Sequence, residues 1–213
     1  MTGATLARPH VWRPGPGGPD RAGALLLLHG TGGDEHDLLP LAERLAPAAP
    51  VLSVRGTVLE NGLPRFFRRL AEGVFDEDDL RARVDELAAF LTAAEQEYGV
   101  AAGSWTAVGF SNGANIASAL LLRRPAALSA AVLLAAMVPF RDPPEADLAG
   151  KRVLVANGRR DPMATPAQTD TLVGQLRERG AEVTVLPHAG GHTVDPGQLP
   201  AITGFLEAAA DRR

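Results

Sequence analysis

The sequence predicts an α/β protein with a doubly wound, mostly parallel sheet of about seven strands and helices on both faces. Short apolar runs alternate along the chain with longer amphipathic segments, as expected for repeated strand–helix units. Polar residues do not alternate with apolar ones inside these runs, so helices should cover most strands on both sides. The expected strands cover residues 24–28, 51–54, 106–110, 130–137, 153–156 and 183–186, with a weaker edge strand at 10–13.

Four helices are expected between and after these strands. In the first, within residues 78–98, apolar residues recur every three or four positions and form one stripe: Leu80, Val84, Leu87 and Leu91. Gly99 marks a plausible end of this helix. The other three are expected at 112–124, 166–179 and 200–210. Thr165 precedes a proline and is placed to cap the third helix.

Length and composition exclude several classes of protein. A chain of 213 residues with 46% hydrophobic composition can bury a substantial core, and we expect one domain over residues 1–213. The net charge of −4 and the absence of a basic block argue against nucleic acid binding. No apolar run approaches the ~20 residues of a membrane span, and the start of the chain lacks a signal peptide's apolar stretch. We therefore expect a cytoplasmic protein with an exposed Pro- and Gly-rich loop at 13–23.

The absence of cysteine narrows the chemistry. Without a thiol, neither a cysteine nucleophile nor a thiolate metal site is possible, and the fold contains no disulfide. The acidic cluster at residues 34–37, with His29 nearby, could suggest a metal site. Its spacing matches no HExxH-type pattern, and adjacent residues on a helix point in different directions. We expect no metal and no cofactor, and interpret these acids as the first turn of a helix.

Three residues that follow predicted strands suggest a nucleophile with its base and acid. Ser111 lies between Gly109 and Gly113, directly after the strand at 106–110. Asp161 follows the strand at 153–156, and His192 follows the strand at 183–186. Ligands bind beyond the carboxyl ends of strands in open α/β sheets, and the chain order Ser, Asp, His is that of an α/β-hydrolase.

The chemistry explains why these residue types occur together. A serine hydroxyl is a weak nucleophile at neutral pH and needs an imidazole to take its proton. A carboxylate bonded to the other imidazole nitrogen fixes the tautomer and stabilises the imidazolium. The two glycines leave room where a strand and a helix crowd the serine turn. The alternative, a serine that only caps a helix, is less favoured because Asp161 and His192 follow in the expected order.

An oxyanion site should complete the arrangement. A tetrahedral intermediate needs backbone N–H groups directed at its oxygen. One is expected from Asn112, after the nucleophile, and a second from Thr31 in the glycine-rich loop that follows the first buried strand. His29 should brace this loop through hydrogen bonds. An ordinary strand-to-helix turn capped by Asp34 is compatible with the same role.

Four stretches together resemble a known family. HGTGGDEHDL, GFSNGAN, NGRRDPMATP and GGHTV are similar to motifs of the bacterial phospholipase/carboxylesterase family of α/β-hydrolases, relatives of the acyl-protein thioesterases. The resemblance runs from about Leu25 to Thr193. It implies a Ser111–Asp161–His192 triad, Thr31 and Asn112 as oxyanion donors, and hydrolysis of carboxylic esters or thioesters. It also makes a homodimer plausible.

Other histidines and aspartates compete for these roles. His188 precedes His192 by a few residues, but His192 follows two glycines that allow the loop to fold back. Asp142 and Asp147 lie in a proline-rich stretch and suit solvated loop positions. Asp195 is too close to His192 along the chain and is interpreted as a cap before Pro196.

The segment 60–75 is the expected specificity element. In one interpretation Phe66 or Phe67 lines the substrate pocket and Arg65 meets a polar group of the substrate. In the other, the phenylalanines anchor a cover to the core and the arginines pair with Glu72, Asp76 or Glu77. Here Phe66-Phe67-Arg68-Arg69 replaces the Trp-Phe-Asp type of stretch of the thioesterases, which argues against a long acyl chain.

These observations predict a serine esterase for small, short-chain carboxylic esters. A thioesterase, lysophospholipase or lactone hydrolase could use the same residues, and acyl length cannot be read from them. A binding protein on an inactive hydrolase scaffold is a further alternative, which the intact Ser, Asp, His and glycines disfavour.

Overall fold

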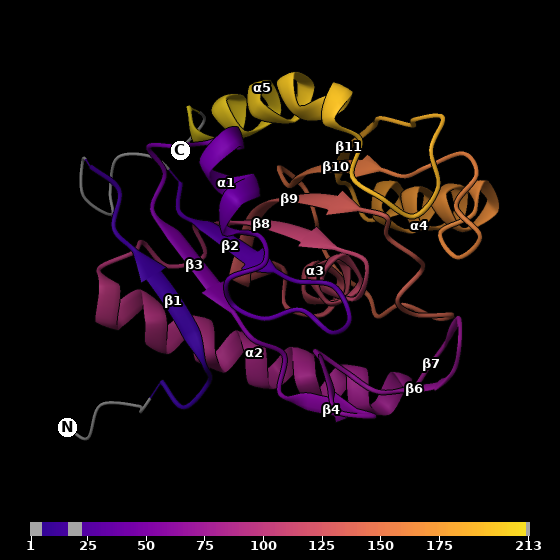
Figure 1. The fold of residues 1–213 in the computed structure, drawn as a ribbon, viewed down its shortest axis with the longest axis horizontal. Coiled ribbons are helices and arrows are strands. Elements are labelled where there is room, and N and C mark those ends of the chain that lie inside the picture. Colours follow the sequence, from indigo (N-terminus) through magenta and orange to yellow (C-terminus); the bar gives the residue numbers. More distant parts are fainter. Residues whose placement is uncertain (1–5, 17–22, 212–213) are drawn as a thin grey trace.

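The computed structural model describes residues 6–16 and 23–211, so residues 17–22 of the predicted 13–23 loop lie outside it. Its centre is a seven-stranded sheet in the order β1-β3-β2-β8-β9-β10-β11 (Figure 1). Only the β1–β3 pair in this sheet is antiparallel. The strands are β1 His10–Arg13, β2 Leu25–Leu28, β3 Val51–Val54, β8 Trp105–Phe110, β9 Leu128–Leu134, β10 Arg152–Ala156 and β11 Glu182–Val185. The predicted fold class is confirmed.

Helices cover both faces of the sheet. They are α1 Leu39–Leu45, α2 Glu77–Tyr98, α3 Asn112–Arg123, α4 Pro166–Glu178 and α5 Leu199–Ala210. Side chains alternate across a strand, so Leu26 and Leu28 of β2 pack with the cluster formed by α2, α3 and α4. Leu25 and Leu27 pack on the other face with α1 and α5. Figure 1 shows α1 and α5 on one side of the sheet and α2 on the other.

The helix ends follow from local chemistry, and Gly99 and Thr165 have the roles predicted for them. Asp76 caps α2 by accepting a hydrogen bond from Asp79 N at 3.1 Å, and Gly99 ends it in the left-handed conformation, with φ 68°. Thr165 caps α4 by accepting from Gln168 N. All four residues of the predicted α2 stripe are buried: Leu80, Val84, Leu87 and Leu91. Among the described residues, no helix is long and apolar enough to cross a bilayer.

Some elements differ from the prediction. β9 ends at Leu134 instead of residue 137, because Ala135 turns the chain with φ 52°. β11 is an edge strand and is mostly exposed, so it is not covered on both faces. The acids after β2 do not form a helical turn, since α1 begins only at Leu39. Asp34 instead accepts a hydrogen bond from His36 N within the preceding loop.

Two small hairpins between β3 and α2 are not apparent from the sequence. They consist of β4 Val58–Glu60 with β5 Leu63–Arg65, and β6 Arg69–Ala71 with β7 Val74–Phe75. Each strand has only two or three residues, which is too short for a periodic pattern to emerge. They occupy the segment 60–75 in which we expected the specificity element.

The strand order determines where a site can form. The chain passes from β2 to β3 on one side and then crosses back over β2 to reach β8. The chain leaves β2 toward β3 on one side and leaves β8 toward β9 on the other. Connections that run in opposite directions leave a crevice at the carboxyl ends of β2 and β8. Thr31 follows β2 and Ser111 follows β8, so both lie at this crevice. Asp161 and His192 follow β10 and β11 at the same edge of the sheet.

Candidate active site

Ser111 sits on a strained turn between β8 and α3. Its backbone has φ 53° and ψ −114°, a conformation that non-glycine residues rarely adopt. The neighbouring glycines are required for steric reasons. A Cβ at Gly113 would lie 1.9 Å from Leu28 O, and one at Gly109 would lie 2.6 Å from Gly113 O. Helix α3 therefore passes against the end of β2, and the turn presents Ser111 at the crevice.

His192 bridges Ser111 and Asp161. The distance from His192 Nε2 to Ser111 Oγ is 2.8 Å, and the distance from His192 Nδ1 to Asp161 Oδ2 is 2.7 Å. The Asp161 side chain is fully buried, whereas the imidazole remains 20% exposed. The second carboxylate oxygen, Oδ1, accepts hydrogen bonds from Met163 N at 2.8 Å and Ala164 N at 3.0 Å. With both oxygens bonded, the carboxylate can turn away from the imidazole only by breaking these bonds.

Backbone contacts join the loop that carries Asp161 to the loop that carries His192. Arg160 N donates to Gly190 O at 3.0 Å, and Arg159 N donates to His188 O at 2.8 Å. A Cβ at Gly158 would lie 2.3 Å from Gly191 O, so a glycine is needed for this close approach. His188 is buried, and its Nδ1 accepts from Gly190 N. The rival histidine thus supports the loop and does not bond to Ser111.

The rival aspartates also lie elsewhere. Asp147 accepts a hydrogen bond from Ala149 N in its own loop. Asp195 caps a short 3₁₀ turn by accepting from Gly197 N, as expected. Asp142 is exposed in the loop after β9. Asp161 is the aspartate that the structure brings to the imidazole of His192.

Two backbone N–H groups near Ser111 are free to bind an anion. Those of Thr31 and Asn112 have no acceptor within residues 6–16 and 23–211, and both residues line the hollow that contains Ser111. Asn112 is the first residue of α3, where amides lack helical partners and the helix dipole favours negative charge. This placement is compatible with the predicted oxyanion role, which stays a prediction.

The segment Pro64–Phe66 is hydrogen-bonded to Thr31, Gly32 and Asn112, next to the two free N–H groups. Pro64 O accepts a hydrogen bond from Gly32 N at 2.9 Å, and Arg65 Nη1 donates to Thr31 Oγ1 at 2.7 Å. Phe66 N donates to the Asn112 side-chain oxygen, Oδ1, at 2.7 Å. The end of β5 therefore ties the loop after β2 to the first turn of α3. The Asn112 side chain, for which the sequence suggested no role, is part of this brace.

His29 fixes the other side of the same loop. Its Nδ1 lies 2.6 Å from Gly30 O, and its Nε2 accepts from Gly56 N at 2.9 Å. These bonds require a neutral imidazole that carries its proton on Nδ1. The side chain is 1% exposed, and burial lowers the pKa of His29. His29 thus has the bracing position that we expected for it.

The hollow at Ser111 has a volume of about 300 Å³, which suits a small ligand. Besides the residues already placed there, its lining includes four apolar side chains, Phe75, Phe110, Met137 and Met163. The prediction that Phe66 and Phe67 line this pocket is wrong. Both side chains are at most 1% exposed and pack in the core with α2 and α3, so they anchor the cover to the fold.

Arg65 does line the hollow, together with Arg69, which sequence reasoning missed. Neither of these arginines pairs with the acids that we expected. Arg69 Nε donates to Glu60 Oε1 at 2.7 Å, and Arg65 Nε lies 3.2 Å from Glu60 Oε2. Arg68 instead pairs with Asp76 at 2.9 Å, as anticipated for the arginines of this segment. The strand pairing of β4 with β5 brings Glu60 next to Arg65. No sequence pattern predicted this contact.

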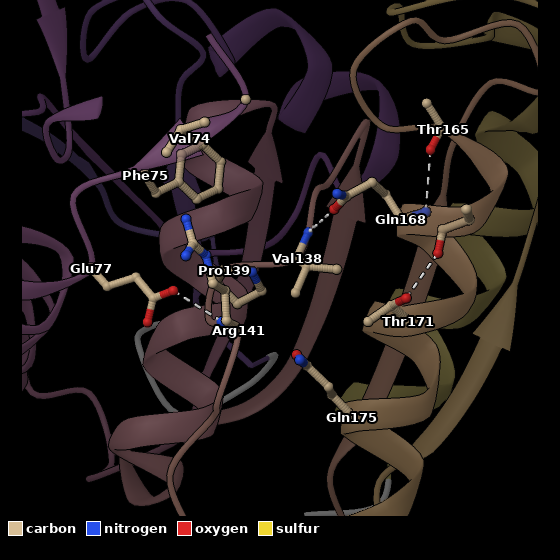
Figure 2. A pocket seen from close by; sticks show the side chains of 12 residues that line it. Val74, Phe75, Glu77, Val138, Pro139, Arg141, Thr165, Gln168, Thr171 and Gln175 are labelled. Carbon is tan, nitrogen blue, oxygen red and sulfur yellow. Dashed lines mark hydrogen bonds between the residues drawn. The ribbon is translucent and has the colours of Figure 1, made fainter. Parts of the chain in front are cut away.

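A second hollow of about 380 Å³ lies beside the first and shares Gly73 and Phe75 with it. Figure 2 shows its walls, where Gln168 Oε1 accepts from Val138 N and Glu77 Oε1 accepts from Arg141 N. Although it is larger, none of the described residues that line it is a nucleophile with an adjacent base. Among the described residues no cluster of metal-binding side chains is present either.

The chain resembles several known hydrolases over most of its length, although no family profile matches it. MhqD of Bacillus subtilis, which carries the name of a hydrolase, is 49% identical over 168 residues, or 79% of this chain and 84% of MhqD. A Bacillus cereus carboxylesterase structure is 47% identical, with a TM-score of 0.91 and 96% of each chain covered. A Mesorhizobium loti carboxylesterase is 34% identical, with a TM-score of 0.88, over 97% of this chain and 96% of its own.

The lowered pKa of His29 predicts a pH dependence of stability. Above pH ~6.5 the imidazole is neutral in both the folded and the unfolded chain. Below that value the unfolded state gains a proton that the folded state excludes, so the free energy of unfolding falls as the pH falls. His29→Gln should reduce the slope of this free energy against pH, below about pH 6.5, by up to ~1.4 kcal/mol per pH unit.

Urea unfolding at several pH values measures this slope. His36→Gln is the matched control, because His36 is exposed to solvent whereas His29 is buried. An unchanged slope in His29→Gln would contradict a buried, neutral His29.

Proposed function

The chain belongs to the bacterial phospholipase/carboxylesterase family of α/β-hydrolases and is a carboxylesterase-type hydrolase, and from this premise we propose that Ser111, His192 and Asp161 form its catalytic triad. The substrate is a small carboxylic ester, and the reaction passes through an acyl-enzyme. The observation that carries the proposal is the unbroken series of short contacts from Asp161 through His192 to Ser111.

In the first half of the reaction Ser111 Oγ attacks the ester carbonyl carbon while His192 Nε2 takes its proton. The carbonyl oxygen becomes negative and accepts hydrogen bonds from the N–H groups of Thr31 and Asn112. Asp161 stabilises the imidazolium that forms, because its buried carboxylate remains bonded to Nδ1. Collapse of the intermediate breaks the ester C–O bond, and His192 returns the proton to the departing alcohol.

In the second half a water molecule attacks the acyl carbon. His192 takes a proton from the water, and the same two N–H groups bind the new oxyanion. The C–O bond to Ser111 then breaks, and the proton moves from His192 to Ser111 Oγ. The carboxylic acid leaves, and the serine is restored. No cofactor is needed for any of these steps.

The size of the hollow supports short substrates. A volume of about 300 Å³ is at the lower end of ligand pockets in proteins. Its four apolar side chains suit a small acyl or alcohol group.

Replacement of the nucleophile tests the proposal directly. Ser111→Ala should lower kcat for p-nitrophenyl acetate by roughly a thousandfold or more, because the remaining groups cannot form an acyl-enzyme. Ser118→Ala, on the same helix, is the matched control and should keep near wild-type activity, since Ser118 Oγ only donates to Asn115 O. Wild-type activity in Ser111→Ala would rule the mechanism out.

The hydrogen bond that Arg65 donates to Thr31, in the loop after β2, gives a further prediction. Thr31→Val keeps the backbone N–H but loses the hydroxyl that accepts from Arg65, so the loop should shift away from the oxyanion position. We expect a fall of about tenfold in kcat with little change in KM, because the interaction matters most in the transition state.

Thr31→Ser retains the hydroxyl and serves as the matched variant. Steady-state kinetics with p-nitrophenyl acetate should place it within about threefold of wild type. Equal kcat values for Thr31→Val and the wild type would show that the hydroxyl does not position the loop.

A further inference from the structure

The wall of the active-site hollow carries an uneven set of charges. Apart from His192, the ionisable residues that line it are Arg65, Arg69 and Glu72. Glu60 lies behind the two arginines and contacts both of them, at 3.2 Å and 2.7 Å. Two guanidinium groups therefore share one carboxylate, which leaves this part of the wall with an excess of one positive charge.

Glu72 does not balance this charge in the structure. It is exposed at the turn between β6 and β7, and within the described part of the chain it forms no ion pair. Arg65, in contrast, has a side chain only 4% exposed, and that of Arg69 is 32% exposed. Charges held in this way are screened by water less than a charge at an exposed turn.

The arginines also keep donors unused. Arg65 donates through Nε to Phe67 O and through Nη1 to Thr31 Oγ1, and Arg69 donates through Nε to Glu60. Over residues 6–16 and 23–211, no acceptor contacts Nη2 of Arg65 or either Nη of Arg69. A planar guanidinium with free N–H groups matches the geometry of a carboxylate.

We propose that the preferred substrate is a small carboxylic ester carrying a second, ionised acid group, which pairs with Arg69 and Arg65 while the ester carbonyl lies at Ser111. This inference rests on the proposed esterase function and specifies its substrate class. The acid group can belong to the acyl part or to the alcohol part, because both face the same hollow. Apart from Arg65, Arg69, Glu72 and His192, the side chains that line the hollow are apolar or uncharged and do not repel an anion.

Two matched pairs of esters test this inference. Monomethyl glutarate and methyl pentanoate differ in the charge of the acyl part. In the second pair, 4-acetoxybenzoate and 4-acetoxybenzamide differ in the charge of the leaving group. The kcat/KM values of the wild type, from pH-stat titration of the released acid, should favour the anionic member of at least one pair by about tenfold. This preference should shrink as NaCl rises from about 10 mM to about 500 mM.

Variants identify the residue whose charge produces the preference for anionic esters. Arg69→Gln should reduce the ratio of anionic to neutral kcat/KM by about tenfold, and Arg69→Lys should retain part of it. Arg44→Gln removes an exposed positive charge on α1 and should leave the ratio unchanged. The salt series on the wild type needs no variant, so it tests the inference even if Arg69→Gln does not fold.

The outcomes separate this inference from the proposed function. Hydrolysis of the neutral esters without preference for the anionic ones, or a preference that Arg69→Gln leaves intact, would overturn the inference and leave the esterase function standing. Failure to hydrolyse any of the four esters would count against both.

Discussion

The strained backbone at Ser111 is the constraint on which the rest of the site depends. The positive φ at this residue occurs where β8 ends and α3 begins with Ser111 alone between them. That packing in turn needs Gly113, whose Cα lies too close to Leu28 O for any side chain. A strained backbone conformation of this kind costs free energy, and it persists only where the surrounding packing and hydrogen bonds hold it in place. Here the buried strands β2, β8 and β9 supply that support, with Ser111 N donating to Leu134 O at 2.8 Å.

The parts of the site come from distant stretches, and backbone contacts hold them together. The segment Pro64–Phe66 ties the loop after β2 to the first turn of α3, and the loop carrying Asp161 is bonded to the loop carrying His192. Few of these links are side chain to side chain, so they tolerate sequence change better than a network of ion pairs would. The exception is Arg65, which both contacts Thr31 and lines the substrate hollow. Under the proposed function, recognition of substrate and position of the oxyanion loop are therefore linked through one residue.

The sequence predicted the sheet, four of the five helices and the residues that meet at Ser111, because each has a strong local signal. Apolar runs mark the strands, and glycines flank the serine turn. It failed where the outcome depends on packing between distant segments. Phe66 and Phe67 looked like pocket residues, but their aromatic character only indicates burial, and the core is where they are buried. Likewise, no sequence pattern indicates that Arg65 and Arg69 share Glu60, because the β4–β5 hairpin brings Arg65 to Glu60 and the chain that follows returns Arg69 to the same carboxylate.

The central claim is that Ser111 is a nucleophile activated by His192. Labelling with a fluorophosphonate probe, followed by tandem mass spectrometry of the digested protein, tests it most directly. The account predicts a single covalent adduct on Ser111, because only an activated hydroxyl attacks the probe. No adduct, or an adduct on another residue with Ser111 unmodified, would contradict it.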